Sequence, residues 1–314
     1  MKNTPRVWGT KVQEEFDKKR QELLPKIRDY IGANKRFAGL PVTVTFVEKG
    51  TSSLVSTIET PQEKVVLKIP LDCTIRGESH FLKIWKQEGV AVPHVIDEGF
   101  IGDHPFTLMI HIDAPALDSR DSGELIQEKI YVDIGRTLRA MHRPAAEGYG
   151  RFADGHGEFD TFEDWLQGPY VTQRTAYVDS HQILDDTHGS LVAAKNVLVA
   201  YVGAGTPSSY CHNDFDVTNI FDTQPLTVFD PSTTLNNGYL DLSCSIILAV
   251  KMGGGIAATK QLKEGYFEGE SYDARALQAG ALLNGYLRIA YLHRAGREES
   301  VERIRNYLSQ TRQF

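Results

Sequence analysis

The stretch from Tyr210 to Asp241, YCHNDFDVTNIFDTQPLTVFDPSTTLNNGYLD, constrains this chain more than any other part of its sequence. Within it His212, Asp214 and Asn219 follow the pattern H-x-D-x-x-x-x-N, and Asp230 comes after a second apolar run. Side chains suited to acid–base and metal chemistry therefore recur at short, fixed separations along the chain.

The apolar residues around this pattern predict a hairpin. Ile220 and Phe221 precede a turn at Gln224-Pro225, and Leu226 to Phe229 follow it. Two short strands joined by such a turn would carry Asn219 and Asp230 to the same end of the hairpin.

This spacing is that of a kinase catalytic loop followed by its metal-binding aspartate. Transfer of a γ-phosphoryl group needs one carboxylate to orient the acceptor hydroxyl, and separate oxygen ligands for Mg²⁺. Asp214 would do the first task, and Asn219 and Asp230 would hold the metal. The alternative is a surface loop whose Asp and Asn residues only cap and turn the backbone.

The composition predicts a cytoplasmic enzyme with two lobes. A chain of 314 residues is long enough for two substantial cores, and its formal charge of −7 argues against a general nucleic-acid binder. The charged amino terminus lacks a signal-peptide core, and the apolar run Ile246 to Ala258 is broken by Lys251 and three glycines. Three cysteines without a C-x-x-C pair predict neither a disulfide framework nor structural zinc.

The first third of the chain predicts a helix followed by strands. Helical spacing of apolar residues predicts a leading helical segment over 11–31, with Pro25 placed to start a second helical stretch. Core packing is the expected fate of its apolar stripe, with partner binding as the alternative. Leu40 to Ile69 predicts a three-stranded antiparallel sheet, and Val90 to Phe100 with Pro105 to Ile112 predicts a further hairpin.

Two backbone segments of this first lobe are candidates to bind a nucleotide. The turn between the first two strands would lie over the phosphates through Gly50, Thr51, Ser52 and Ser53. With its single glycine, a plain hairpin turn is an equally good interpretation. Backbone groups of Met109, Ile110 and Ile112 would hold the adenine ring between the lobes.

Lys68 is the charged candidate of the first lobe. It lies in the middle of the strand V-V-L-K-I, where its apolar neighbours predict burial, and a buried ammonium needs a partner. Glu78 begins a helical run, ESHFLKIWKQEG, and is the expected partner in an ion pair that supports phosphate binding. The alternative for Lys68 is an edge-strand residue that points to water.

The second lobe is predicted to be mainly helical. The turn-rich segment from Asp113 to Asp121 marks the boundary, so the predicted lobes are residues 1–112 and 113–314. Apolar spacing predicts helices over Gly123–His142, Thr161–Leu166, Ala176–Leu184, Gly189–Val202, Leu262–Gly269, Ala274–His293 and Glu298–Leu308.

Motifs of several other enzyme classes are missing from the sequence. It has no GxxxxGK[ST], HExxH or GxSxG, and no D-F-G or A-P-E follows the loop, which argues against a protein kinase. The set VVLKI with Glu78, VAVPHVIDEG, LMIHI, RAMH, CHNDFDVTN, VFDP and DLS resembles the aminoglycoside phosphotransferase and choline kinase-like family. The resemblance covers roughly Val42 to Phe267.

This resemblance implies a bilobal, protein-kinase-like α+β fold with an antiparallel-sheet N-lobe and a mainly helical C-lobe. It also implies ATP or GTP as donor with Mg²⁺, Asp214 as catalytic aspartate, Asn219 and Asp230 as metal ligands, and Lys68 with Glu78 at the phosphates. Asp241 would brace the catalytic loop and His212 would orient it. Asn213 departs from the family pattern, which often has glycine there, and Pro231 stands where an aromatic residue is frequent.

The predicted function is a small-molecule O-phosphotransferase, with an aminoglycoside or related antibiotic as the first candidate acceptor and a resistance role. The acidic charge fits an acceptor that could be cationic. A metabolic kinase for choline, homoserine, a fructosamine or a thioribose is the alternative within the same class. A catalytically silent nucleotide-binding module is the alternative from another class. We expect a monomer or homodimer that binds neither nucleic acid nor membrane.

Overall fold

The computed structural model describes residues 10–47, 53–72, 74, 77–184, 188–203 and 205–311 of the chain. Its contacts divide the chain into two compact units, residues 1–82 with 93–113 and residues 83–92 with 114–314. The segment 83–92 is grouped with the second unit. The division into a nucleotide-binding lobe of residues 1–112 and a catalytic lobe of residues 113–314 stays a prediction.

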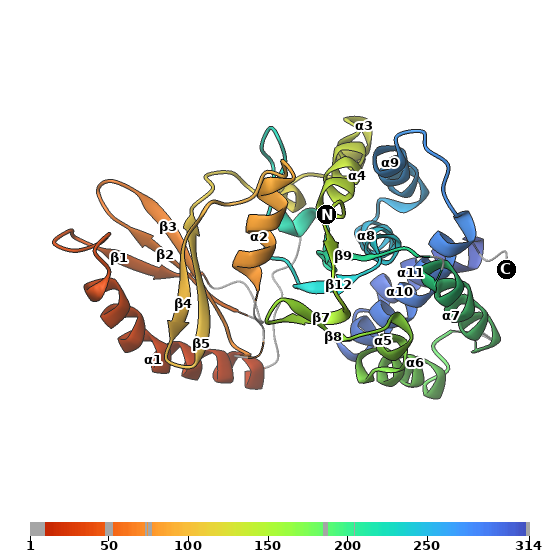
Figure 1. The fold of residues 1–314 in the computed structure, drawn as a ribbon, viewed down its shortest axis with the longest axis horizontal. Helices are drawn as coiled ribbons and strands as arrows, with labels where there is room; N and C mark the ends of the chain where they lie inside the picture. The colour runs from red at the N-terminus through yellow and green to blue at the C-terminus, as the bar shows by residue number, and fades with distance from the viewer. Residues whose placement is uncertain are drawn as a thin grey trace. The chain divides into compact units, whose positions relative to one another are not determined.

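The first unit is built on one five-stranded antiparallel sheet. Its strands lie in the order β1-β2-β3-β5-β4 (Figure 1), which joins the predicted three-stranded sheet and the predicted hairpin through the β3–β5 pair. The elements of this part of the chain are α1 (Thr10–Ala33), β1 (Thr43–Phe46), β2 (Ser53–Glu59), β3 (Lys64–Pro70), α2 (Glu78–Gln87), β4 (Val95–Ile101) and β5 (His104–Ile110). Helix α2 begins in the first unit and ends in the second.

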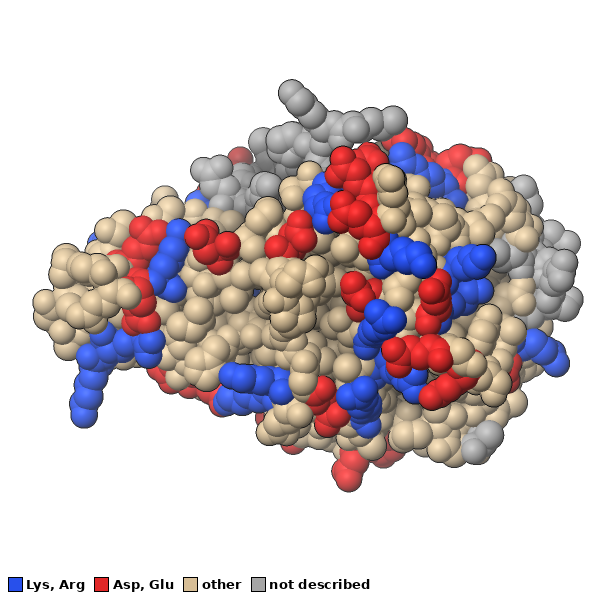
Figure 2. Space-filling view, turned by 90° about the horizontal axis from the view of Figure 1, so that it is seen from above, with Lys and Arg blue, Asp and Glu red and all other residues tan. Residues whose placement is uncertain are grey.

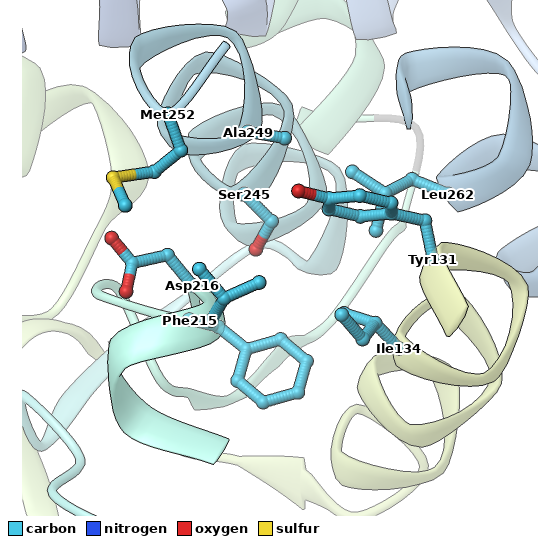
Figure 3. A pocket seen from close by; sticks show the side chains of 9 residues that line it. Tyr131, Ile134, Phe215, Asp216, Ser245, Ala249, Met252 and Leu262 are labelled. Carbon is cyan, nitrogen blue, oxygen red and sulfur yellow. The ribbon is translucent and has the colours of Figure 1, made fainter. Parts of the chain in front are cut away.

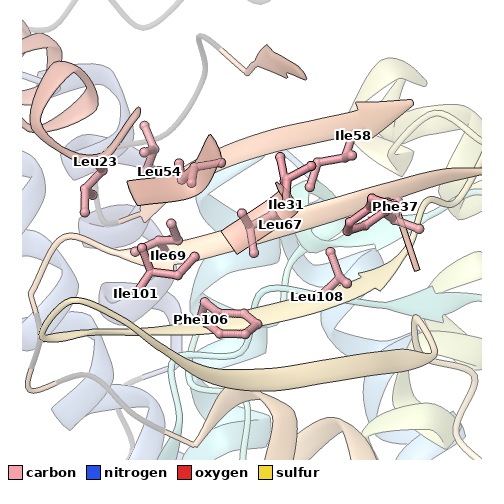
Figure 4. Close-up of a cluster of buried hydrophobic side chains, with 12 residues drawn as sticks. Leu23, Ile31, Phe37, Leu54, Ile58, Leu67, Ile69, Ile101, Phe106 and Leu108 are labelled. Atoms are coloured by element: carbon pink, nitrogen blue, oxygen red, sulfur yellow. The ribbon is translucent and has the colours of Figure 1, made fainter. Parts of the chain in front are cut away.

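Helix α1 covers one face of this sheet and closes its core (Figures 1 and 4). Leu23, Ile27 and Ile31 recur at intervals of four residues and are buried against apolar side chains of the strands. The strand residues of this core are Leu54, Ile58, Val65, Leu67, Ile69, Ile101, Phe106 and Leu108. The apolar stripe therefore serves core packing, as expected, within the residues described.

Pro25 does not start a second helix, and this prediction was wrong. The structure has one helix from Thr10 to Ala33 with Pro25 inside it. A proline in a helix interior removes one backbone hydrogen bond. Because Leu23 and Ile27 on either side of the proline are both buried in the same core, packing keeps the two halves in one helix.

The second unit contains most of the helices. Its elements up to residue 211 are η1 (Leu117–Ser119), α3 (Ser122–Gln127), α4 (Ile130–Met141), β6 (Ala145–Ala146), β7 (Tyr149–Ala153), β8 (His156–Phe159), α5 (Phe162–Gln167), α6 (Pro169–Ser180), α7 (His188–Gly203) and β9 (Ser208–Cys211). The remaining elements are η2 (Val217–Asn219), β10 (Ile220–Phe221), β11 (Thr227–Val228), β12 (Thr234–Asn236), α8 (Gly238–Lys251), α9 (Gly255–Phe267), α10 (Ala274–Arg294) and α11 (Glu298–Thr311).

Several of these elements differ from the prediction. The long helix expected from Gly123 to His142 is two helices, because Lys129 between them takes a left-handed conformation with φ of 58°. The helix expected from Ala176 begins earlier, at Pro169. A second five-stranded sheet, in the order β6-β9-β12-β7-β8, was not predicted at all. Its strands are only two to five residues long, too short for an alternating pattern to stand out.

Helices α8 and α10 form the centre of the second unit, with other helices around them in Figure 1. Every residue of α8 from Leu240 to Val250 is buried. Helices α4 and α9 approach each other through two glycines: a Cβ on Gly265 would lie 1.9 Å from the Val132 carbonyl oxygen, and one on Gly135 would lie 2.3 Å from the Leu262 carbonyl oxygen. Only glycine permits this backbone contact.

The surface carries charges of both signs. Figure 2 shows acidic and basic side chains interspersed on one face of the molecule. None of the described helices combines the length and the apolar character needed to cross a lipid bilayer.

Candidate active site

In the first unit, the ion pair expected between Lys68 and Glu78 is present. The Lys68 Nζ atom lies 2.8 Å from Glu78 Oε1, and about a tenth of each side chain is exposed, 10% and 9%. Lys68 lies on β3, which pairs with β2 on one side and β5 on the other, so it is not on an edge strand. A buried ammonium needs such a partner, and the ion pair fixes its position.

The candidate nucleotide-binding segments are only partly described. Gly50, Thr51 and Ser52 lie outside the described residues, and Ser53 is buried as the first residue of β2. The prediction for this turn therefore stays a prediction.

The adenine-binding candidates lie at the end of β5. Met109 and Ile110 are strand residues, and the Ile110 N–H donates to the His94 carbonyl oxygen at 3.0 Å. Ile112 lies beyond the strand, and its N–H and C=O have no hydrogen-bond partner among the described residues. Of the three candidates, Ile112 thus has the backbone groups available for a base edge.

In the second unit, one loop brings Asp214 and Asn219 into contact. The loop follows β9 and leads into η2, whose last residue is Asn219. The Asn219 Nδ2 atom donates to the Asp214 carbonyl oxygen at 2.7 Å and to Asp214 Oδ2 at 3.3 Å. Asn219 is buried, whereas the Asp214 side chain is 44% exposed and can meet a substrate.

The predicted hairpin is present, and Asp230 follows its second strand. Strands β10 and β11 pair with Ile220 opposite Val228, and the Phe229 N–H donates to the Asn219 carbonyl oxygen at 3.1 Å. Asp230 follows directly, in a left-handed conformation with φ of 58°.

The oxygen donors of this loop suit Mg²⁺. Since Asn219 Nδ2 is engaged by Asp214, its Oδ1 atom is the remaining ligand, and Asp230 adds a carboxylate. An amide oxygen and a carboxylate are hard ligands of the kind that Mg²⁺ prefers, so these residues fit the predicted metal.

His212 and Asp241 fix the loop through hydrogen bonds to its backbone and to the neighbouring strand. The Asp241 carboxylate accepts the backbone N–H groups of His212 at 2.6 Å and Asn213 at 2.7 Å. The His212 ring is fully buried, and its Nε2 donates to the Phe229 carbonyl oxygen at 2.9 Å. His212 therefore links the Asp214 loop to the strand that precedes Asp230.

The conformation of Asn213 accounts for its departure from the family pattern. Its φ is 57°, in the left-handed region. Glycine reaches this region without strain, and asparagine does so more readily than most other residues. Asparagine is thus suited to the conformation that the loop has at this position.

A buried ion pair fixes the start of η2. The Asp216 side chain caps this turn by accepting the Thr218 N–H at 2.8 Å, and Lys251 Nζ of α8 lies 2.9 Å from Asp216 Oδ2. Burial alone would raise the pKa of Asp216, but the Lys251 ammonium and the Thr218 donors outweigh it and lower the pKa. Asp216 is thus held as an anion three residues before Asn219.

Another cluster of ligand-type side chains is better explained as scaffold. The ligating atoms of His142, Cys211 and Asp241 lie within 4.8 Å of one another. His142 Nε2 donates to Asp241 at 3.0 Å, and the Cys211 thiol donates to the Asn236 carbonyl oxygen at 3.3 Å. Burial raises the pKa of the Cys211 thiol well above its ordinary value, so the protonated thiol is favoured over a metal-binding thiolate.

A small cavity is lined in part by Phe215, Asp216 and Val217, the residues that follow Asp214 (Figure 3). Its lining is mainly apolar, and the polar groups in it are Asp216 and the hydroxyls of Tyr131 and Ser245. Both hydroxyls are buried without a hydrogen-bond partner in the described part of the chain. Since Asp216 is already paired with Lys251, the cavity does not offer a site for Mg²⁺ or phosphate groups.

Arg288 is a residue of this site that the sequence reasoning missed. Its Nη2 atom lies 3.3 Å from Asp214 Oδ1. Arg288 belongs to α10, where it stands between the buried residues Leu287 and Ile289. A lone charge inside a buried helix needs a partner, and this was the signal that could have found it.

Three acidic residues of the second unit, Glu268, Glu270 and Asp273, are engaged by neighbouring groups. Glu268 pairs with Arg136 and Arg139, both at 3.2 Å, and Glu270 pairs with Arg139 at 2.6 Å. Asp273 caps α10 by accepting the Ala276 N–H at 2.9 Å. These carboxylates are therefore not an open acidic patch.

Most of the chain matches a known protein family. The family model described as phosphotransferase enzyme family matches residues 43–278. No curated protein matches the sequence.

Solved structures of kinases share the fold. A thermostable mutant of aminoglycoside phosphotransferase APH(4)-Ia, in a ternary complex with ADP and hygromycin B, is 16% identical with a TM-score of 0.62, covering 91% of this chain and 97% of that one. A choline/ethanolamine kinase family protein from Mesorhizobium loti is 16% identical with a TM-score of 0.55, covering 92% of each chain. The predicted α+β, protein-kinase-like fold is confirmed by these matches.

Proposed function

Because this chain belongs to the phosphotransferase enzyme family, we propose that it transfers the γ-phosphoryl group of ATP or GTP to a hydroxyl of a small molecule. The observation that carries the proposal is the loop in which Asn219 and Arg288 hold an exposed Asp214 carboxylate, with Asp230 at the end of the adjoining hairpin.

In the proposed reaction, the acceptor hydroxyl donates a hydrogen bond to Asp214, and its oxygen attacks the γ-phosphorus. The bond between the γ-phosphorus and the bridging oxygen breaks, and the nucleoside diphosphate leaves with the bonding electrons. The hydroxyl proton passes to Asp214 late in the transfer. Lys68, held by Glu78, contacts the phosphates of the donor. Mg²⁺, held by Asn219 and Asp230, would supply positive charge for those phosphates.

An aminoglycoside or related antibiotic is the first candidate acceptor. Its support is the likeness to a fold whose solved example binds hygromycin B.

A metabolic small-molecule kinase is the second candidate, and one observation favours it. Glu268 and Glu270, which could have attracted amino groups, are neutralised by Arg136 and Arg139. A thioribose carries no amino group and is compatible with such a surface. Choline, homoserine and a fructosamine carry a cationic nitrogen, as an aminoglycoside does, and their support is the likeness to the fold of a choline/ethanolamine kinase family protein.

The first test is donor consumption with Mg²⁺ across aminoglycosides, choline and small sugars, with ATP and GTP in parallel. We expect Asp214→Ala to bind the Mg–nucleotide as the wild type does and to lose turnover by about 10²- to 10⁴-fold. Asp29→Ala, at an exposed position of α1, is the matched control and should be unchanged.

The outcomes separate the alternatives. Turnover with an antibiotic supports a resistance kinase, and turnover with a metabolite supports a metabolic one. Nucleotide binding without any transfer favours the silent module. If Asp214→Ala turned over like Asp29→Ala, the role of Asp214 would be wrong.

A further inference from the structure

The inference concerns Arg288 and rests on the proposed function. The central stretch of α10, from Ala276 to Ala290, is mostly buried, and the Arg288 side chain is 21% exposed. Keeping a guanidinium in such a place is costly unless it is paired. Its position is therefore explained by what it contacts, and the charged group it contacts is Asp214.

Asp214 is the one anionic partner of Arg288 among the described residues. Arg288 Nη2 also lies 3.7 Å from the Cys244 sulfur. Burial raises the pKa of the Cys244 thiol to about 11, so this neighbour is neutral near pH 7. The Cys244 thiol donates to the Asn213 carbonyl oxygen at 3.5 Å, which ties it to the loop without adding charge.

The two oxygens of Asp214 are held from two elements. Asn219 donates to Oδ2 at 3.3 Å and Arg288 donates to Oδ1 at 3.3 Å. The carboxylate is thereby oriented by a neighbour on its own loop and by a residue 74 positions away on α10.

Arg288 has hydrogen-bonding capacity left over. A guanidinium carries five N–H donors in a planar fork. Both hydrogen bonds that Arg288 makes to described residues use Nη2, so Nε and Nη1 have no partner in that part of the chain. Donors of this kind are suited to bind the oxygens of a phosphoryl group.

During transfer, the phosphoryl group arrives at the oxygen that Asp214 holds. Its negative oxygens then approach a carboxylate of the same sign, and this repulsion raises the barrier unless a cation lies beside both groups. The cation that contacts Asp214 in the structure is Arg288.

We propose that Arg288 is a further residue of the transfer site: it holds Asp214 through Nη2, and with its remaining N–H groups it binds the phosphoryl group as the group moves to the acceptor. Its ligand is the transferring phosphoryl group itself.

The test compares Arg288→Ala and Arg288→Lys with Arg275→Ala, a change of the same kind at an exposed position of the same helix. Turnover is measured at saturating Mg–ATP with the acceptor identified among the aminoglycosides, choline and small sugars. If none of these is phosphorylated, water serves as the acceptor. Nucleotide affinity and the midpoint of urea unfolding are measured on the same samples.

We expect Arg288→Ala to lower kcat by about 10²- to 10³-fold while the Kd for Mg–ATP changes less than about threefold, since the group acts in the transition state. Arg288→Lys should keep part of the rate, because it restores the charge without the fork. Guanidinium ion at non-denaturing concentration should restore turnover to Arg288→Ala in a saturable way, and should not restore Asp214→Ala. A role in folding alone would not give this rescue.

The inference is overturned if Arg288→Ala turns over like Arg275→Ala, or if its loss follows a loss of folded protein and guanidinium rescues nothing. Should Arg288→Ala not fold, Arg288→Gln takes its place for the kcat and Kd comparison, and an unchanged kcat would overturn the inference. Failure of the proposed function looks different, because then the wild type transfers no phosphoryl group, or Asp214→Ala is as active as the wild type.

Discussion

Replacement of Asp241 by Asn tests whether this carboxylate supports the Asp214 loop. Asp241 is buried at the start of α8 and accepts three hydrogen bonds, from the backbone N–H groups of His212 and Asn213 and from His142 Nε2. Asparagine is nearly the same size but offers one acceptor oxygen instead of two. Its amide group would have to face one of the three donors.

The expected loss follows from these contacts. If the amide oxygen kept the bonds to His212 and His142, the Asn213 N–H would lose its acceptor and would face an NH₂ group. A hydrogen bond to a charged group is worth about 1.5–3 kcal/mol, and a buried donor left unsatisfied costs about 1–3 kcal/mol. We therefore expect the free energy of unfolding of the second unit to fall by about 3–5 kcal/mol.

The assay is urea unfolding followed by tryptophan fluorescence, because Trp85 and Trp165 both belong to the second unit. The control is Asp273→Asn, an exposed cap of α10 where asparagine caps as well as aspartate, so the change should stay within about 0.5 kcal/mol. A loss for Asp241→Asn no larger than that of the control would refute the assignment of Asp241 as the support of the loop.

Two further predictions concern the same unit. The Asp216–Lys251 pair should make the free energy of unfolding depend on pH in acid solution. Because the pKa of Asp216 is lowered from 3.8, the pair contributes fully to that free energy above this value, and the contribution is lost as the pH falls through the folded-state pKa. The difference in unfolding free energy between wild type and Asp216→Asn should thus be constant above about pH 5 and shrink below about pH 4, and a difference that grew on acidification would contradict the ion pair. Gly265→Ala should destabilise the protein by about 1–3 kcal/mol or more in the same urea assay, since its Cβ would lie 1.9 Å from the Val132 carbonyl oxygen. Gly189→Ala in α7, where a Cβ meets nothing within 4 Å, should instead be neutral or stabilise by up to about 1 kcal/mol, and equal effects of the two changes would disprove the close approach.

The sequence alone determined the features that depend on neighbours along the chain. Asp214 and Asn219 are five residues apart and are in contact, as the H-x-D-x-x-x-x-N spacing indicated. The β10–β11 hairpin follows from two apolar runs around one turn, and Lys68 finds Glu78 only ten residues away. Periodicity and spacing report such local geometry directly, because a short stretch of chain allows only a few relative positions of the two residues at its ends. The roles of these residues in catalysis stay predictions.

The tertiary structure alone decided which distant residues complete the loop. Asp241 reaches His212 across 29 positions, and Arg288 reaches Asp214 across 74. The second sheet likewise joins β7, β9 and β12, and no local sequence pattern predicts that these strands pair. Even Pro25, which should end a helix by its local chemistry, lies inside α1 because the sheet packs against both halves of that helix. Contacts of this kind depend on how helices and strands pack, and packing is settled by the burial of many side chains at once rather than by any short stretch of sequence.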